Sequence, residues 1–378
     1  MKEIIFSFGT RPEAIKMVPV IKVFKKDKTN YNTIVIVTGQ HREMLDRVLS
    51  TFDIKPDYDL DLMTTDQSLG KLTSKILMEL DNIFTELKPD LIFAQGDTIT
   101  TFATSLASFY QKIPLGHIEA GLRTNNIYSP FPEELNRRIT SLIATYHFAP
   151  TKEARENLLR EGVKKEKIFI TGNTGIDTFL SVSDKLDNQS INEKFEDKFQ
   201  NKYGIKLKYN NMILVTGHRR ESFGQGLKNI CEAIKLIAKN NNEIQIVYPV
   251  HLNPNVKETV FSIIKNINNV YLIEPQDYES FVFLIKKAYF LLTDSGGIQE
   301  EAPAIGKPVL IMRENTERPE GILAGTTKLV GTDKNKIINM VQELLTNDTK
   351  YKEMSKAINP YGDGTASEKI FNYINSIL

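Results

Sequence analysis

The chain alternates short apolar runs with longer amphipathic segments from its first residues to about residue 330. The apolar runs are rich in Ile, Val and Phe and hardly alternate with polar residues, which is typical of strands buried on both faces of a parallel sheet. We therefore expect strands at 3–8, 33–38, 90–94, 114–118, 147–149 and 167–171, and again at 212–216, 243–248, 269–273, 290–293, 308–312 and 328–330.

Between these runs, apolar residues recur at helical spacing. The clearest stripe lies in residues 68–87, and Pro89 helps to end that helix. The pattern lapses between about 184 and 211, a polar stretch that indicates a surface helix or linker. Alternating strands and helices predict an α/β protein with right-handed crossovers. We expect two doubly wound Rossmann-like domains, at about 1–175 and 205–360, facing across a cleft.

Composition narrows the class of protein. The 378 residues include 48 Lys and Arg against 47 Asp and Glu, and this balance argues against a nucleic-acid partner. No apolar run approaches the roughly 20 residues of a membrane helix, and the N-terminus lacks the features of a signal peptide. The one cysteine, Cys231, permits no internal disulfide. We expect a cytoplasmic protein with no membrane partner.

Ligands of open α/β sheets bind beyond the carboxyl ends of the strands. The first expected strand is followed by GTRPEAIK, in which Pro12 suits a helix start. Arg11 and Lys16 would lie at the positive end of that helix, suited to an anion, although a capped turn with solvated charges fits equally well. Gly9 has no second glycine two residues on, and there is no Walker A loop, so signatures for nicotinamide and ATP binding are missing.

Two further strand ends carry carboxylates. Asp97 follows the third expected strand, where it either acts in catalysis or caps the next helix. His117 and Glu119 are two residues apart, and we expect them on one face of the fourth strand. A buried acid there needs a partner or a raised pKa, which favours a functional role.

The segment SPFPEELNRR has two acid–base spacings of four residues. Glu133 precedes Arg137, and Glu134 precedes Arg138, in a helix that Pro132 can begin. Two surface ion pairs explain the spacing, at about 0.3–0.5 kcal/mol each. The sharper alternative turns Glu133 and Arg137 into the cleft, where they would support acid–base chemistry.

The second half carries two candidate anion sites. His218 lies between glycine and arginine residues in GHRRE, at the end of an expected strand. Further on, Ser295, Gly296 and Gly297 follow a strand and open a helix, so their backbone amides could approach a diphosphate. Glu301, one helical turn later, could accept hydrogen bonds from ribose hydroxyls. The alternative is a tightly packed helix start without a ligand.

Several of these motifs occur together and in order. They are GTRPEAIKM at 9–17, QGDT at 95–98, GHIEAGLRT at 116–124, SPFPEE at 129–134, GHRRE at 217–221, DSGG at 294–297 and TERPE at 316–320. The chain thereby resembles the bacterial non-hydrolysing UDP-N-acetylglucosamine 2-epimerases from residue 3 to about 332. The resemblance implies a glycosyltransferase-B-like pair of domains, usually dimeric, with the helix at about 366–378 packed back on the N-terminal domain.

The implied reaction interconverts UDP-N-acetylglucosamine (UDP-GlcNAc) and UDP-N-acetylmannosamine (UDP-ManNAc). The family eliminates UDP to give 2-acetamidoglucal and adds it back after inversion at C2, in the supply of ManNAc for surface polysaccharides such as capsules. The resemblance implies no cofactor, and we expect no metal. The expected partners are a UDP-sugar substrate and a second copy of the chain.

Residue roles are carried over by motif. The resemblance implies acid–base work by Asp97, Glu119 and Glu133, support from Arg137, and stabilisation of the leaving diphosphate by His218. The implied substrate contacts are Arg11, Lys16, Gln276, Phe281, Ser295, Gly296, Gly297, Glu301 and Arg318. Some relatives have a second, activating UDP-GlcNAc site, and the matching residues are Gln40, His41, Arg219 and His251. Glu43 and Asp66 depart from the residues expected in activated relatives.

Four other functions stay open at this point. A hydrolysing epimerase would release free ManNAc and UDP, and a related epimerase could act on a modified UDP-sugar. A glycosyltransferase shares the architecture but needs an acceptor and would not exchange the hydrogen at C2. A non-catalytic nucleotide-sugar sensor would have no use for three carboxylates in the cleft.

Overall fold

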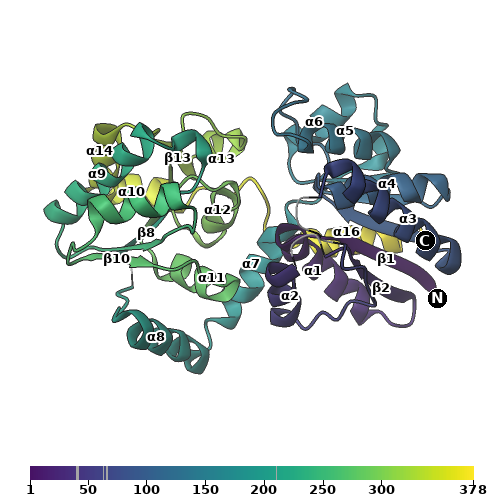
Figure 1. The fold of residues 1–378 in the computed structure, drawn as a ribbon, viewed down its shortest axis with the longest axis horizontal. Helices are drawn as coiled ribbons and strands as arrows, with labels where there is room; N and C mark the ends of the chain where they lie inside the picture. The colour runs from purple at the N-terminus through teal and green to yellow at the C-terminus, as the bar shows by residue number, and fades with distance from the viewer. Residues whose placement is uncertain (40–41, 63, 65–66, 210) are drawn as a thin grey trace. The chain divides into compact units, whose positions relative to one another are not determined.

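Both sheets of the protein are parallel, and each belongs to a separate unit of the chain. The computed structural model describes residues 1–39, 42–62, 64, 67–209 and 211–378. Unit 1 joins Met1–Thr178 to Gly362–Leu378, and unit 2 is Phe179–Tyr361. Strands and helices alternate in both, which confirms the expected α/β class (Figure 1).

Unit 1 contains a seven-stranded sheet in the order β3-β2-β1-β4-β5-β6-β7. Its strands are β1 (Lys2–Phe8), β2 (Tyr31–Val37), β3 (Tyr58–Asp59), β4 (Leu91–Gln95), β5 (Leu115–Ile118), β6 (Tyr146–Ala149) and β7 (Ile168–Ile170). Its helices are α1 (Arg11–Lys26), α2 (Arg42–Thr51), α3 (Leu69–Leu87), α4 (Ile99–Tyr110), α5 (Glu133–Ile143), α6 (Lys152–Arg160), the short η1 (Lys165–Lys167) and α16 (Ala366–Asn375). The strand order reverses direction between β1 and β4, which is where open parallel sheets bind ligands.

Unit 2 contains a six-stranded sheet in the order β10-β9-β8-β11-β12-β13. Its strands are β8 (Met212–Thr216), β9 (Gln245–Pro249), β10 (Val270–Ile273), β11 (Phe290–Thr293), β12 (Val309–Ile311) and β13 (Thr327–Leu329). Its helices are α8 (Gln189–Tyr203), η2 (Arg220–Ser222), α9 (Gln225–Asn240), α10 (Pro254–Ile264), α11 (Tyr278–Lys287), α12 (Gly296–Glu301), η3 (Ala302–Ile305), α13 (Pro319–Ala324), α14 (Lys334–Thr346) and α15 (Asp348–Ser355), and α7 (Thr174–Lys185) runs from unit 1 into unit 2. Here the order reverses between β8 and β11.

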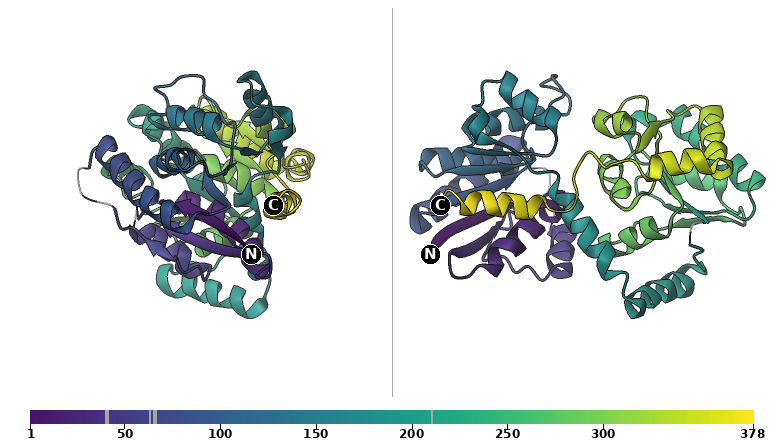
Figure 2. Two further views of the ribbon diagram at one scale, coloured as in Figure 1. Left: turned by 90° about the vertical axis from the view of Figure 1, so that its right-hand side faces the viewer. Right: turned by 180° about the vertical axis from the view of Figure 1, so that it is seen from behind.

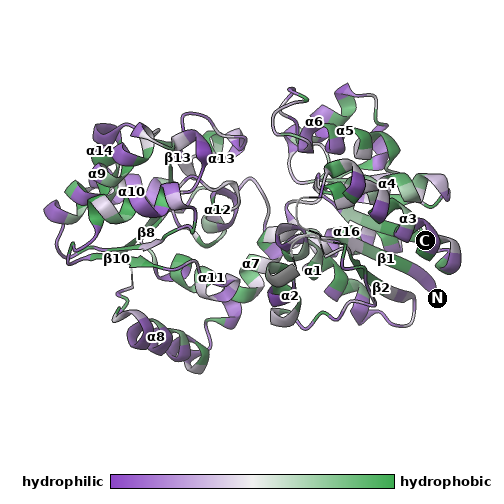
Figure 3. Cartoon of the chain, in the orientation of Figure 1, coloured by the Kyte–Doolittle hydropathy of each residue, from purple (hydrophilic) through white to green (hydrophobic). Residues whose placement is uncertain are grey.

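All twelve expected strands are present, with ends shifted by no more than a few residues. The pattern missed β3, which has only two residues and no room for a hydrophobic run. The polar stretch at 184–211 contains α8, whose side chains are mostly hydrophilic (Figure 3). Among the described residues, no helix is long and apolar enough to cross a bilayer.

The cores explain why these strands read as continuous apolar runs. In unit 1, Ile5, Ile36 and Ile92 pack with Leu80 and Phe84 of α3, and all five side chains are buried. In unit 2, the strand residues Ile213 and Tyr248 pack against α9, which contributes Ile234. Strands covered on both faces need apolar residues at consecutive positions, so no alternation survives.

The last helix packs within unit 1, although it follows unit 2 in the sequence (Figure 2). Phe371 of α16 lies edge-to-face on Phe24 of α1, with ring centroids 5.0 Å apart. Asp177 accepts hydrogen bonds from the backbone N–H groups of Ser367, at 2.7 Å, and Ala366, at 3.3 Å. This carboxylate therefore caps the N-terminus of α16 from a distant part of the chain.

Candidate functional site

In unit 1, two carboxylates meet beyond the ends of β4 and β5. Asp97 follows the turn at Gly96, and Glu119 directly follows β5. The backbone N–H of Gly96 donates to the carbonyl of Ile118 at 3.0 Å, which joins the two strand ends. A Cβ on Gly96 would lie 3.4 Å from Oε2 of Glu119. Asp97 is thus placed next to a second acid.

Glu119 is fixed by two side chains. Lys16 of α1 forms an ion pair with Oε1, and Nε2 of Gln95 donates to Oε2 at 2.5 Å. The backbone of Glu119 is left-handed, with φ of 65°, a conformation that non-glycine residues adopt mainly where surrounding structure enforces it. The resemblance implies a substrate contact for Lys16, and the structure places its ammonium on this carboxylate.

The expectation that His117 and Glu119 share a strand face is wrong, because β5 ends at Ile118. His117 instead lies inside the sheet, fully buried, with Nε2 2.7 Å from the carbonyl oxygen of Gly96. Burial lowers the pKa of His117 to about 3, so the ring is neutral and donates to that carbonyl. The side chain therefore supports the turn that precedes Asp97.

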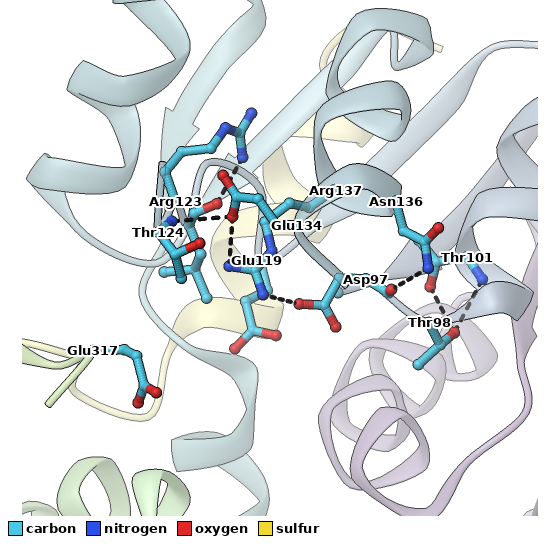
Figure 4. Close-up of polar contacts among 12 residues, drawn as sticks. Asp97, Thr98, Thr101, Glu119, Arg123, Thr124, Glu134, Asn136, Arg137 and Glu317 are labelled. Carbon is cyan, nitrogen blue, oxygen red and sulfur yellow. Dashed lines mark hydrogen bonds and ion pairs between the residues drawn. The ribbon is translucent and has the colours of Figure 1, made fainter. Parts of the chain in front are cut away.

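Helix α5 brings a guanidinium to Asp97 (Figure 4). Arg137 forms an ion pair with Asp97, and Nδ2 of Asn136 donates to the backbone carbonyl of Asp97 at 2.9 Å. Burial raises the pKa of Asp97, Arg137 opposes that rise, and the neighbouring Glu119 adds to it. The pKa of Asp97 is therefore set by opposing influences. A carboxyl group of this kind can be tuned to donate or to accept a proton, as acid–base chemistry requires.

The structure fits neither two surface ion pairs, Glu133–Arg137 and Glu134–Arg138, nor an inward-turned pair of Glu133 with Arg137. Arg138 does pair with Glu134, but Glu134 is fully buried and also accepts the backbone N–H of Thr124 at 3.0 Å. Arg137 contacts Glu134 at 3.4 Å rather than Glu133. Oε2 of Glu133 is buried and hydrogen-bonds to none of the described residues. A buried, unpartnered carboxylate oxygen is suited to a ligand or a proton.

The N-terminus of α1 holds a buried acid that the sequence reasoning missed. Oε2 of Glu13 accepts the backbone N–H groups of Gly9, at 3.1 Å, and Thr10, at 2.8 Å, while Oε1 accepts the hydroxyl of Thr98 at 2.7 Å. Thr10 and Glu13 form a capping box, whose spacing was visible in the sequence. The start of α1, where Arg11 is the first helical residue, is thereby joined to the turn after β4.

In unit 2, the neighbouring ends of β8 and β11 carry a histidine and an aspartate. Oδ2 of Asp294 accepts the backbone N–H groups of His218, at 2.7 Å, and Arg219, at 2.8 Å. Nδ1 of His218 lies 3.2 Å from Oδ1 of Asp294. Burial opposes ionisation of Asp294, but His218 and the two amides outweigh it and lower the pKa. The aspartate fixes the orientation of the imidazole.

Of the four candidate residues for a second site, two can be placed. His251 stacks on His218 with ring centroids 5.4 Å apart, and burial and the His218 charge lower its pKa. Arg219 follows His218, and its Nε is buried and hydrogen-bonds to none of the described residues. Gln40 and His41 lie outside the described residues.

The Ser-Gly-Gly turn opens α12, as expected, but offers fewer amides. The N–H of Ser295 already donates to Oγ1 of Thr293 at 3.0 Å. The first turn of a helix leaves its N–H groups without intrahelical acceptors, so Gly296 and Gly297 remain as donors. A Cβ on Gly296 would lie 3.2 Å from Cζ of Arg318, which places that guanidinium against the turn.

The remaining expected contacts lie around α11. Oη of Tyr278 donates to Oε1 of Glu301 at 3.3 Å, which brings Glu301 to the first turn of this helix. Phe281 belongs to the same helix and is partly buried. Gln276 lies two residues before it and donates to Oη of Tyr203 at 2.9 Å. Gln276 and Phe281 thus belong to one short segment, and Glu301 at the end of α12 is joined to that segment through Tyr278.

The chain matches a family model over most of its length, residues 24–375, and that model describes the UDP-N-acetylglucosamine 2-epimerases. The chain belongs to the UDP-N-acetylglucosamine 2-epimerase family. It is 53% identical to a relative of that name from Campylobacter jejuni, over 99% of this chain and 97% of the relative. It is 54% identical to the one from Escherichia coli K12, over 98% and 97%.

A solved structure supports the same family. The UDP-GlcNAc 2-epimerase from Neisseria meningitidis, determined with UDP-GlcNAc bound, is 48% identical and superposes with a TM-score of 0.90. The match covers 99% of this chain and 100% of that one. The 2-epimerase family therefore accounts for the whole chain, including both sheets.

Proposed function

We propose that the protein interconverts UDP-GlcNAc and UDP-ManNAc without hydrolysing either. The observation that carries this proposal is the group of acids in unit 1, where Asp97 lies beside Glu119 and Glu133 presents a buried oxygen without a partner among the described residues. Neighbouring carboxyl groups titrate at different pH values, so one can donate a proton while another accepts one.

The proposed reaction has two halves. The C2 hydrogen has no adjacent carbonyl to acidify it, so simple removal and return of the proton would be slow. An ionised carboxylate removes that proton while the C1–O bond breaks and its electron pair leaves with UDP, which gives 2-acetamidoglucal. UDP then bonds again to C1, and a carboxylic acid protonates C2 from the opposite face.

The groups of unit 1 are proposed to carry out the proton transfers. Asp97, Glu119 and Glu133 are proposed to pass the proton, and Asp97 and Glu119 each have an ion-pair partner. Arg137 favours the ionised form of Asp97, and Lys16 neutralises Glu119. The ion pairs hold both acids in fixed positions, which lowers the reorganisation needed when the proton moves.

The groups of unit 2 are proposed to bind the nucleotide and accept the charge of the leaving group. His218, Arg318 and the amides of Gly296 and Gly297 offer positive charge or donors to the diphosphate, and Arg11 of unit 1 would add a further cation. Glu301 is proposed to accept ribose hydroxyls, and Gln276 and Phe281 to contact the uracil. Donors placed before the reaction stabilise developing negative charge most effectively.

Two broader features belong to this proposal. We expect a dimer, because the neighbouring helices α3, α4 and α5 expose large apolar side chains, among them Met78, Phe109, Tyr110 and Leu142. Light scattering of the purified chain should therefore give twice the monomer mass, and a monomer mass would contradict the dimer. We also expect the product to supply ManNAc for surface polysaccharides.

The test is proton NMR of the purified protein with UDP-GlcNAc in D2O, with no acceptor added. Appearance of UDP-ManNAc, with deuterium at C2 in both nucleotide sugars, is the expected result. Free ManNAc with UDP would instead show a hydrolysing enzyme. No change in UDP-GlcNAc or in modified UDP-sugars would contradict the epimerase and leave the transferase or the sensor.

A further inference from the structure

One guanidinium in unit 2 joins two loops beyond the sheet. Arg313 lies two residues after β12, and its side chain is only 6% exposed. Its Nε donates to Oε1 of Glu221 at 2.5 Å, and its Nη1 and Nη2 donate to the two oxygens of Glu317 at 2.9 and 3.1 Å. Nη2 also reaches Oε2 of Glu221 at 3.4 Å. A single planar group thus serves two carboxylates.

Each carboxylate belongs to a loop with a proposed diphosphate contact. Glu221 lies three residues after His218, in the 3-10 turn η2. Glu317 directly precedes Arg318, and its Oε2 lies 3.6 Å from Nη1 of that residue. The ion pairs therefore connect the loop after β8 with the loop after β12.

Arg313 also affects the charge balance around Arg318. Arg318 also donates from Nε to Oε1 of Glu300 at 2.7 Å, so two acids compete for its charge. Arg313 neutralises part of the charge of Glu317, which leaves more of the Arg318 charge for a phosphate. Without Arg313, the carboxylates of Glu300 and Glu317 would both draw on the charge of Arg318, at a place proposed to bind a further anion.

We propose that Arg313 is a positioning residue for diphosphate binding. It holds the His218 loop and the Arg318 loop in the arrangement that meets the leaving group, and it keeps the carboxylate next to Arg318 neutralised. This inference rests on the proposed function. Arginine suits the task because its flat fork can serve two carboxylates at once, which the ammonium of lysine cannot.

The test compares Arg313→Met with Lys287→Met. Lys287 has a side chain only 11% exposed and pairs with Glu196 in the same unit, but that pair touches neither loop. Binding of UDP is measured by calorimetry, and binding of uridine, which lacks the diphosphate, by ligand-observed NMR. We expect Arg313→Met to weaken UDP binding at least tenfold and to leave uridine binding unchanged, while Lys287→Met changes neither.

The outcomes separate positioning from general damage. An equal loss of UDP and uridine binding in Arg313→Met would mean general structural damage and would overturn the inference, as would unchanged UDP binding. Adding Glu317→Gln to Arg313→Met removes the uncompensated charge, so part of the UDP affinity should return, and failure to recover any would also count against it. If the methionine variant does not fold, Arg313→Lys keeps the charge beside Glu317 but loses the flat fork, so it tests the positioning of the two loops alone and should still weaken UDP binding more than uridine binding. Wild-type protein that binds no UDP would overturn the proposed function and the inference with it.

Discussion

The charged side chains of the candidate site influence one another's pKa values. Asp97 is subject to burial and Glu119, which raise its pKa, and to Arg137, which lowers it. Glu119 in turn is held by Lys16. Each acid has its own ion-pair partner, although Lys16 also lowers the pKa of Asp97. Of the two cations, Arg137 has the larger effect on the pKa of Asp97.

Replacing Arg137 by methionine tests this arrangement. The pKa of Asp97 should rise further, because the variant loses the main influence that favours the ionised form. Whichever limb of the pH profile of kcat/KM reports Asp97 should therefore move to higher pH, and kcat should fall roughly 10²-fold. The profile is measured from C2 deuterium exchange in D2O, and an unshifted profile would contradict the assignment.

Asp97→Asn should separate stability from activity. A carboxyl group whose pKa is raised on folding contributes stability below its unfolded pKa and loses it as the pH rises through the folded value. Ionisation of Asp97 is therefore unfavourable for folding, and the neutral amide of asparagine should leave the melting temperature equal or higher. C2 exchange should be abolished. A clear drop in melting temperature at pH 7 would contradict the conclusion that ionised Asp97 destabilises the fold.

The sequence pattern located most of these residues but not their partners. Asp97, Glu119 and His218 are predictable because each lies within three residues of the end of an apolar run. The expected shared face of His117 and Glu119 is wrong, since strand alternation stops at Ile118, the last residue of β5. Asp294 acts through the backbone N–H of His218, which lies beyond the end of the neighbouring strand β8. Contacts of that kind depend on strand order, which the pattern of one chain does not contain.

At the scale of elements, Glu13 connects the start of α1 with the turn after β4. Glu13→Ala would leave the buried N–H groups of Gly9 and Thr10 without their acceptor, at a cost of about 1–3 kcal/mol in unfolding free energy. The proposed activity should fall as well, because Thr98 neighbours Asp97. Glu13→Gln keeps an oxygen for the two amides, so it should retain most of the stability in urea unfolding. Equal losses in both variants would contradict this account.

The strands themselves were predictable because a parallel sheet covered on both faces demands consecutive apolar residues. The two-residue strand β3 has too little sequence to produce such a signal. The sheet orders, with reversals at β1/β4 and β8/β11, then explain why Arg11, Asp97, His218 and Asp294 lie at the carboxyl ends of these four strands. The doubly wound domains expected from the pattern imply one reversal in each sheet, but the pattern does not say between which strands it falls.

At the scale of the whole molecule, unit 1 is built from two separate stretches of chain. The second stretch adds α16, which is held by aromatic contacts and by the cap from Asp177. Asp177→Ala should lower the unfolding free energy by about 0.5–2 kcal/mol, the usual effect of removing an N-cap. Urea unfolding followed by circular dichroism measures the change, and an unchanged midpoint would show that the aromatic contacts suffice.

The discontinuity of unit 1 also bears on how the protein is made. Multidomain chains usually complete their domains in order from the N-terminus during synthesis. Here Gly362–Leu378 are translated after every residue of unit 2, so the unit that is begun first must be finished last. Until α16 has been synthesised, the ring of Phe24 lacks part of its cover. The nascent protein should therefore complete unit 2 first, and unit 1 only after residues 362–378 have been synthesised.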